Sequence, residues 1–168
     1  MEAKHIFNLP YKKISILTHP SSYVHAIVKF KNGLIKIIAH DTTMTIPIYN
    51  TINVNENTFI KTENLNLEKL NNLRLKKVNF KLFPLVKILK KLPQNISLFE
   101  TVLVSINDYL VSLYLDKKIS YNQLQVLLMQ FINNKVFAKY KKLKPNKIQD
   151  IISVQNKVNS FIIKSINK

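Results

Sequence analysis

The chain has 168 residues, 46% of them hydrophobic and 10% aromatic, which is enough to bury a core in one domain, or in one small domain with part of another. It contains no Cys, which excludes a disulfide framework and a thiolate metal site and agrees with a reducing cytoplasm. The net charge is +17, but all of the 26 basic residues except Arg74 are Lys, whereas recognition of phosphates and bases favours the bidentate Arg side chain.

The first forty residues predict a short helix end followed by β-structure. Residues 1–8 are typical of the end of a helix, and a turn at Leu9-Pro10-Tyr11 leads into an apolar strand over residues 12–18. In residues 23–30, apolar and polar side chains alternate well enough to predict a second strand. The pair Asn32-Gly33 then favours a tight hairpin turn into a third strand over residues 34–39, because both residues adopt positive φ angles readily.

The next forty residues carry weaker patterns. Residues 42–52 predict a short helical piece that contains Pro47. Residues 53–82 predict an irregular connection with one short strand at residues 75–80. This stretch separates the β-rich beginning of the chain from its second half.

From Phe83 onward the apolar residues follow helical spacing. Two sequences, at residues 97–100 and 120–123, fit the capping box, in which a Ser oxygen and a later Glu or Gln satisfy free N–H groups of the first helical turn. Pro84 and Pro145 also stand where helices can begin. The sequence therefore predicts a helical domain over residues 83–168.

Two helices of this domain are predicted in more detail. The segment Leu98–Leu115 is apolar on nearly every side, so we expect it to be the central helix, and its polar residues argue against a membrane span and a membrane anchor. In the last segment we expect one apolar stripe along the helix, formed by Ile148, Ile151, Ile152, Val158, Phe161, Ile162 and Ile166. Together the patterns predict an α+β chain, a partial α/β sheet segment with a β-hairpin followed by a small helical bundle.

Short motifs in unbroken register add a family resemblance. Residues 19–28 (HPSSYVHAIV) resemble the HPQSxxHSMV segment of the 1-deoxy-D-xylulose 5-phosphate reductoisomerase family, and residues 42–48 (TTMTIPI) resemble its PDMRxPI element. Residues 1–8 resemble the IEA helix of that family and the turn after it. Further along, Phe83-Pro84 resembles the Tyr-Pro that opens its C-terminal bundle, and Asn107-Asp108 resembles an Asn-Glu pair in its central bundle helix.

The resemblance, over residues 1 to about 135, implies a function. The family converts 1-deoxy-D-xylulose 5-phosphate to 2-C-methyl-D-erythritol 4-phosphate in non-mevalonate isoprenoid synthesis, as a cytoplasmic homodimer that uses NADPH and Mg²⁺ or Mn²⁺. By the same resemblance, residues 1–52 are the end of its catalytic domain, residues 53–82 a connector and residues 83–168 its C-terminal bundle. Its metal carboxylates, substrate-phosphate ligands and cofactor turn correspond to no residue of this chain. We therefore expect the chain alone to bind neither cofactor nor metal and to be inactive without an N-terminal half.

Two residues near the active site of the family have counterparts here. His25 matches a histidine close to that site, and Met44 matches a methionine in the loop that approaches the NADPH adenine. No catalytic or metal-binding residue is assigned. Around Met44 the sequence departs from the family pattern, with His40 in place of Gly, Thr42 in place of Pro and Thr45 in place of Arg, which puts the cofactor contact in doubt.

The residues themselves allow other functions. His19 and His25 lack the acidic pair that a Mg²⁺ or Mn²⁺ site requires. The Lys-rich stretch at residues 135–147, with Phe137 and Tyr140 interleaved, is the best argument for a basic nucleic-acid-binding helical domain, although the lack of Arg argues against a nucleic-acid partner. A scaffold or dimerisation remnant is a further alternative. A partner pull-down would distinguish a retained scaffold from a gene remnant, because only a scaffold should recover a stable complex.

Overall fold

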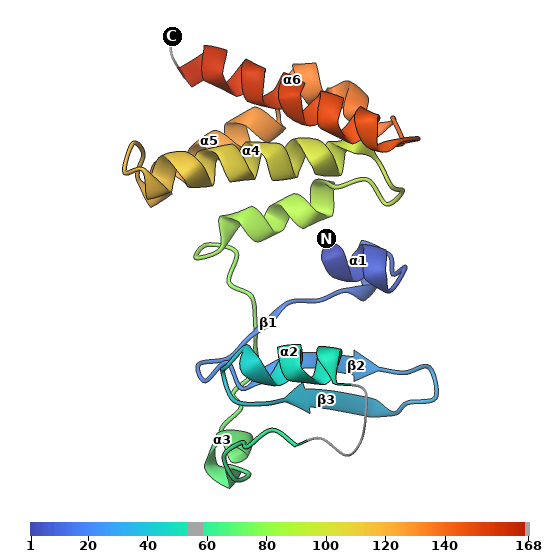
Figure 1. Ribbon diagram of the computed structural model, residues 1–168, viewed down its shortest axis with the longest axis vertical. Coiled ribbons are helices and arrows are strands. Elements are labelled where there is room, and N and C mark those ends of the chain that lie inside the picture. Colours follow the sequence, from blue (N-terminus) through green and yellow to red (C-terminus); the bar gives the residue numbers. More distant parts are fainter. Residues whose placement is uncertain (54–58, 167–168) are drawn as a thin grey trace. The chain divides into compact units, whose positions relative to one another are not determined.

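The computed structural model describes residues 1–53 and 59–166 and divides them into two compact units. One unit, called the bundle unit, contains residues 1–15 and the residues from 79 onward. The other, called the hairpin unit, contains residues 16–78. The fold is α+β, as predicted, with a β-hairpin before a helical bundle (Figure 1).

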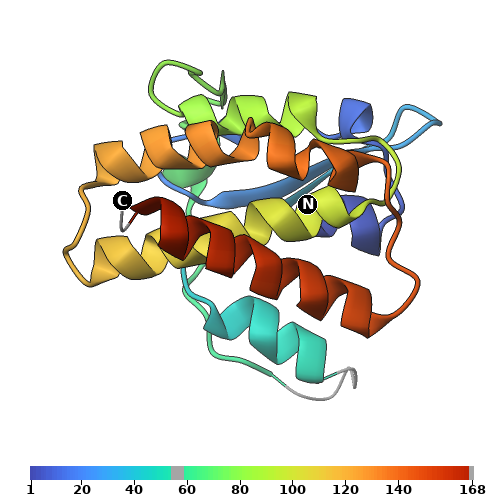
Figure 2. The same cartoon turned by 90° about the horizontal axis from the view of Figure 1, so that it is seen from above.

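The bundle unit is built around one central helix. It contains α1 (Glu2–Ile6), η1 (Tyr11–Lys13), η2 (Pro84–Lys91), α4 (Leu98–Leu115), α5 (Tyr121–Ile132), η3 (Lys135–Lys141) and α6 (Ile148–Ile166). Helix α4 packs against α5, α6 and η3, and η2 packs against α5. Figure 2 shows α4, α5 and α6 side by side in this unit. The predicted position of α4 at the centre of the bundle is confirmed.

One continuous core fills this unit. Val102, Ile106 and Leu110 of α4 have no exposed surface, and Phe137 of η3 joins them in the same cluster. In the part of the chain that the structure describes, α4 is the helix long and apolar enough to cross a membrane, and 44% of that stretch is buried. A central bundle helix has the same composition, because its partners cover it on several sides.

The two predicted capping boxes have different outcomes. Ser120 and Gln123 form the predicted box at the start of α5, with both reciprocal hydrogen bonds present. At the start of α4 the prediction is wrong, because Ser97 caps no N–H and its buried Oγ has no hydrogen-bond partner among the described residues. The expected donor, the Glu100 N–H, bonds the Ser97 carbonyl oxygen at 3.3 Å instead, and the carboxylate of Glu100 has other partners.

The start and the buried face of α6 also differ from expectation. The helix begins at Ile148 and not at Pro145. Just before this start, the backbone N–H groups of Asn146 and Lys147 donate hydrogen bonds to the Asp150 carboxylate. These bonds lower the pKa of Asp150. The predicted stripe is wrong over the first turns, where Ile148, Ile151 and Ile152 are exposed, whereas the residues buried from α6 are Val154, Val158 and Ile162.

The hairpin unit contains little regular structure. Strands β2 (Val24–Lys29) and β3 (Ile35–Ala39) form one antiparallel pair, and β1 (Leu17–Thr18) and β4 (Lys76–Lys77) form another. Helices α2 (Thr45–Ile52) and α3 (Leu67–Asn71) complete the unit. The hairpin, the strand near residue 76 and the helix containing Pro47 are confirmed, although α3 lies in the stretch predicted to be irregular. Residues 54–58 of that stretch lie outside the described residues.

The predicted strand over residues 12–18 is wrong for most of its length. Residues 11–13 form η1 in the bundle unit, where the Tyr11 hydroxyl donates to Glu100 at 2.9 Å. Pairing begins only at Leu17, opposite Lys77. The apolar residues between η1 and β1 therefore join the two units and do not belong to a long strand.

The hairpin turn forms where the sequence predicts it, although Gly33 has the predicted positive φ and Asn32 does not. Gly33 has a φ of +88°, a conformation that L-residues rarely adopt. The Asn32 side chain accepts a hydrogen bond from the Leu34 N–H at 3.1 Å. The Phe30 N–H closes the turn by donating to the Leu34 carbonyl at 2.8 Å.

Candidate functional site

The two sequence-predicted site residues lie in the hairpin unit. His25 lies on β2, near the end of the hairpin opposite the turn, and is exposed. Met44 is the N-cap residue of α2, with 70% of its surface exposed. Neither residue is enclosed by other parts of this unit, so each is available for contact with another protein segment or a ligand.

A histidine that the resemblance treated only as a departure contacts His25. The rings of His25 and His40 stack with centroids 3.7 Å apart and planes 9° apart. One ring nitrogen of His25 lies 3.2 Å from the His40 carbonyl oxygen, which fixes the ring against the end of β3. No local pattern could have indicated this pair, because the two residues meet only through the strand register that places Val24 opposite Ala39.

His19 takes part in the local backbone structure. Its Nε2 lies 3.1 Å from the backbone nitrogen of Val24, which donates to it, and its Nδ1 lies 3.2 Å from the Ser21 hydroxyl. These bonds stabilise the turn before β2, where Ser22 has a positive φ of 47°. His19 is therefore a turn residue in this chain.

An ion pair lies next to the stacked histidines in the sequence. Asp41 accepts a hydrogen bond from the Lys69 ammonium at 3.0 Å, and this bond raises the pKa of Lys69. The same ammonium lies 5.5 Å from the centroid of the Tyr23 ring. Tyr23 is buried, so the pair links α3 to the base of the hairpin and is a structural contact.

The described residues do not fit a metal or a dinucleotide. Among residues 1–53 and 59–166 there is no group of three His, Asp or Glu side chains placed to hold a metal ion. A Gly-rich phosphate-binding turn requires several Gly residues, and Gly33 is the single Gly of the chain. The described residues therefore provide no metal site and no Gly-rich dinucleotide-binding turn of their own.

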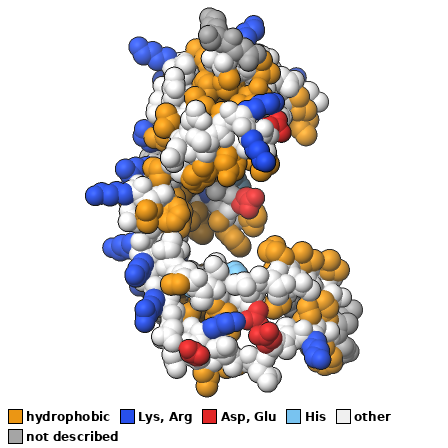
Figure 3. All heavy atoms as spheres, turned by 90° about the vertical axis from the view of Figure 1, so that its left-hand side faces the viewer, with side chains coloured by type: hydrophobic (Ala, Val, Ile, Leu, Met, Phe, Trp, Pro, Cys, Tyr) orange, Lys and Arg blue, Asp and Glu red, His pale blue; other side chains and the backbone are white. Residues whose placement is uncertain are grey.

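The Lys-rich stretch at residues 135–147 belongs to the bundle. Its two aromatic residues, Phe137 and Tyr140, are buried in the core and are not free to stack on bases. The Lys141 ammonium lies 4.8 Å from the centroid of the Phe99 ring. On the face drawn in Figure 3, Lys side chains are scattered over the surface with hydrophobic side chains between them. The alternative of a nucleic-acid-binding domain is therefore not favoured.

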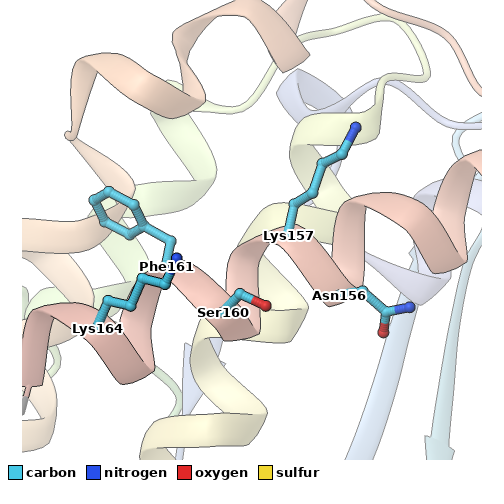
Figure 4. A pocket seen from close by; sticks show the side chains of 5 residues that line it. All are labelled: Asn156, Lys157, Ser160, Phe161 and Lys164. Carbon is cyan, nitrogen blue, oxygen red and sulfur yellow. The ribbon is translucent and has the colours of Figure 1, made fainter.

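Helix α6 also carries a shallow depression. It is lined by the polar residues Asn156, Lys157, Ser160 and Lys164, with the partly buried Phe161 (Figure 4). The Phe161 ring packs edge to face on Phe131 and Phe137. All lining residues come from one helix, and they include no carboxylate or His that could activate the Ser160 hydroxyl, so the depression has no catalytic arrangement.

Comparison with known proteins gives a consistent result. The sequence model described as DXP reductoisomerase C-terminal domain matches residues 41–161. A 1-deoxy-D-xylulose 5-phosphate reductoisomerase of Pelagibacter ubique (strain HTCC1062) is 49% identical over 158 residues, which cover 94% of this chain and 41% of that protein. That of Persephonella marina (strain DSM 14350 / EX-H1) is 33% identical over 170 residues, 100% of this chain and 42% of that protein.

Solved structures show the same fold. DOX-P reductoisomerase in complex with NADPH, fosmidomycin and magnesium aligns with a TM-score of 0.83 and 22% identity, over 99% of this chain and 42% of that chain. The 1-deoxy-D-xylulose 5-phosphate reductoisomerase from Zymomonas mobilis in complex with NADPH aligns with a TM-score of 0.73 and 24% identity, over 94% of this chain and 40% of that chain. This chain thus spans about two fifths of the length of the proteins it matches.

Proposed function

The chain belongs to the DXP reductoisomerase family through its C-terminal domain, and we propose that it supplies the C-terminal portion of a 1-deoxy-D-xylulose 5-phosphate reductoisomerase. In this proposal the complete enzyme uses NADPH and a divalent metal ion to convert the sugar phosphate to 2-C-methyl-D-erythritol 4-phosphate. The isolated chain is inactive. Activity requires the N-terminal portion, which the matched relatives have and which has no counterpart among the residues of this chain.

The observation that carries this proposal is the exposed apolar surface on the β-hairpin of the hairpin unit. Ile35, Ile37 and Ile38 of β3 are 54%, 51% and 52% exposed. Because successive side chains of a strand point to opposite faces, Ile37 and Ile38 leave apolar surface on both faces of the sheet. An isolated two-stranded hairpin is at best marginally stable in water. The hairpin therefore needs further strands or helices to cover it.

The matched relatives are long enough to supply that cover. Their remaining length, about three fifths of each protein, has no counterpart in this chain. We propose that an N-terminal portion of this kind packs on the hairpin and also brings the metal carboxylates and the cofactor site. It acts either in the same polypeptide or as a separate chain, and the assembled enzyme is a cytoplasmic homodimer.

The proposed roles of the two site residues rest on the resemblance of residues 19–28 and 42–48 to the family motifs, and the exposure of both side chains agrees with these roles. His25, held by its stack on His40, lines the edge of the assembled active site. Met44 contacts the cofactor from the start of α2. Both side chains are free of cover within the hairpin unit, as such contacts require. The domain division at residues 52 and 82 belongs to the same proposal.

The experiment is a complementation assay. The purified chain is mixed, or expressed, with the N-terminal portion of the Pelagibacter ubique relative, and NADPH oxidation is followed with the sugar phosphate and Mg²⁺. We expect no turnover from either part alone and turnover from the pair. Turnover by this chain alone would refute its inactivity, and a complex that forms without turnover would favour a scaffold.

A further inference from the structure

A buried ion cluster connects the beginning of the chain to the bundle. Lys4 of α1 is 6% exposed and Glu100 of α4 is 9% exposed, and the Lys4 ammonium lies 2.9 Å from Glu100 Oε1. The two residues are 96 positions apart in the sequence. Both belong to the bundle unit, so the contact lies within one compact body.

Two further side chains complete the hydrogen bonding of the carboxylate. His5 Nε2 lies 2.7 Å from Glu100 Oε2, and the Tyr11 hydroxyl donates to Glu100 Oε1 at 2.9 Å. The Lys4 ammonium also lies 4.7 Å from the centroid of the Tyr11 ring and 3.5 Å from the Pro93 carbonyl oxygen. Both carboxylate oxygens are thus bonded, which is the condition for a buried charge to be tolerated.

The cluster is the main attachment of α1 to the bundle. Helix α1 covers only Glu2–Ile6, too short to be stable by itself. Lys4 is its one buried residue, while Ile6 is 73% exposed and the following Phe7 is 67% exposed. Met1 and Tyr11 pack against the core but are only partly buried. Electrostatic and hydrogen-bonding contacts, more than apolar packing, therefore determine how α1 lies on α4.

We propose that Glu100 is a positioning residue of the assembled enzyme, which fixes the direction and register of α1 so that the N-terminal portion is held correctly on the bundle. The inference rests on the proposed function, since it assigns α1 as the junction between the two portions. A buried ionic cluster suits this role. Apolar side chains of similar size are often at least as stabilising, so we assign to the buried charges of this cluster a role in the geometry of the contact. The exposed Ile6 and Phe7 give the N-terminal portion apolar surface to pack on.

The first test uses the chain by itself. We expect Glu100→Gln to accelerate amide hydrogen exchange at Phe7 and Leu9, whose N–H groups close α1, by about ten- to hundredfold, the loss expected for hydrogen bonds to a charged group. The α4 amides should exchange at the rate of the parent chain. The matched control is Asp150→Asn, which removes a helix-capping carboxylate from the same unit and should leave the amides of α1 unchanged.

Two results of this test would overturn the proposal. In the first, the amides of α1 exchange at the same rate in the parent chain and in Glu100→Gln. In the second, α1 and α4 accelerate together, which would mean that Glu100 supports the whole bundle and does not specifically fix α1. The measurement needs no enzymatic activity, so it remains decisive if the complementation assay fails.

The second test uses the complemented enzyme. We expect Glu100→Gln to lower kcat by at least about tenfold, with little change in the KM for NADPH, because the N-terminal portion is misoriented while its cofactor site is intact. The double variant Lys4→Met, Glu100→Leu should keep the melting temperature of the bundle but still show the low kcat. Full activity in either variant would overturn the positioning role, whereas a parent pair without turnover would count against the proposed function alone.

Discussion

The two units of this chain have similar shares of apolar residues but bury them to different extents. In the bundle unit, residues from α4, α5, η3 and α6 form one continuous core. Among the described residues of the hairpin unit, Tyr23 is the one buried hydrophobic side chain. The difference teaches that apolar content alone does not make a folded domain. A bundle closes on itself because its helices cover one another, whereas the strands of this hairpin leave isoleucine side chains exposed on both faces.

The largest expected effect contrasts one isoleucine from each unit. Ile106→Ala should lower the free energy of unfolding by about 2–5 kcal/mol, because it leaves a cavity at a site with 0% exposure. Ile37→Ala, at 51% exposure, should change it by less than about 1 kcal/mol. Urea denaturation followed by circular dichroism measures both. Equal losses would show that the hairpin has a core of its own, contrary to the comparison.

The next effect concerns the hairpin in the presence of its proposed partner. Amides of β2 and β3 should exchange rapidly in the isolated chain. With the N-terminal portion at about 100 times its Kd, their exchange should slow by about 100-fold, since a partner that binds only the folded form stabilises it by mass action. Amides of α4 provide the control and should change little. Unchanged exchange in the hairpin would mean that the partner covers another surface.

A smaller effect compares the same capping bond in the two units. Ser120 caps α5, and Asn66 caps α3 by accepting from the Lys69 N–H at 2.8 Å. Ser120→Ala should cost about 1 kcal/mol of unfolding free energy. Asn66→Ala should cost less in the same denaturation experiment, because α3 buries no residue and its loss leaves the bundle core intact. A larger cost at Asn66 would contradict the independence of the two units.

The smallest effect is a pH response of the bundle unit. Burial by itself raises the pKa of Glu100, but the hydrogen bonds from Lys4, Tyr11 and His5 outweigh burial and lower it below the ordinary value of 4.5. The cluster therefore stabilises the fold fully above pH 4.5, and this contribution is lost as the pH falls through the lower pKa of the folded state.

Thermal melting of the parent chain and of one variant isolates the contribution of Glu100 to this pH response. Thermal melts between pH 6 and about pH 3 should show a decline in the parent chain. In Glu100→Gln the decline should be smaller, because the variant has no carboxylate to protonate at that position. An identical slope in both proteins would show that other carboxylates, such as Asp150, account for the acid sensitivity. The hairpin unit has no buried carboxylate among its described residues and should contribute little.

Features set by neighbouring residues could be predicted from the sequence. The turn at Asn32-Gly33 depends on a positive φ that Gly adopts readily, and the box of Ser120 and Gln123 closes within one helical turn. The continuous apolar run of α4 predicted its central place. The motif register of residues 19–48 predicted the family. In each case the physical cause lies within a few positions of the residues concerned.

Only the tertiary structure decided the features that join distant residues. Glu100 has the local pattern of a capping box, but its carboxylate bonds Lys4, His5 and Tyr11 in place of the Ser97 N–H. Its own N–H bonds the Ser97 carbonyl oxygen, which leaves the Ser97 Oγ without a partner among the described residues. His25 meets His40 through strand register. Local sequence specifies turns, caps and periodicity because these interactions close within a few residues. Which charged group a buried carboxylate binds depends on how the whole chain folds back, and a local pattern contains no information about that.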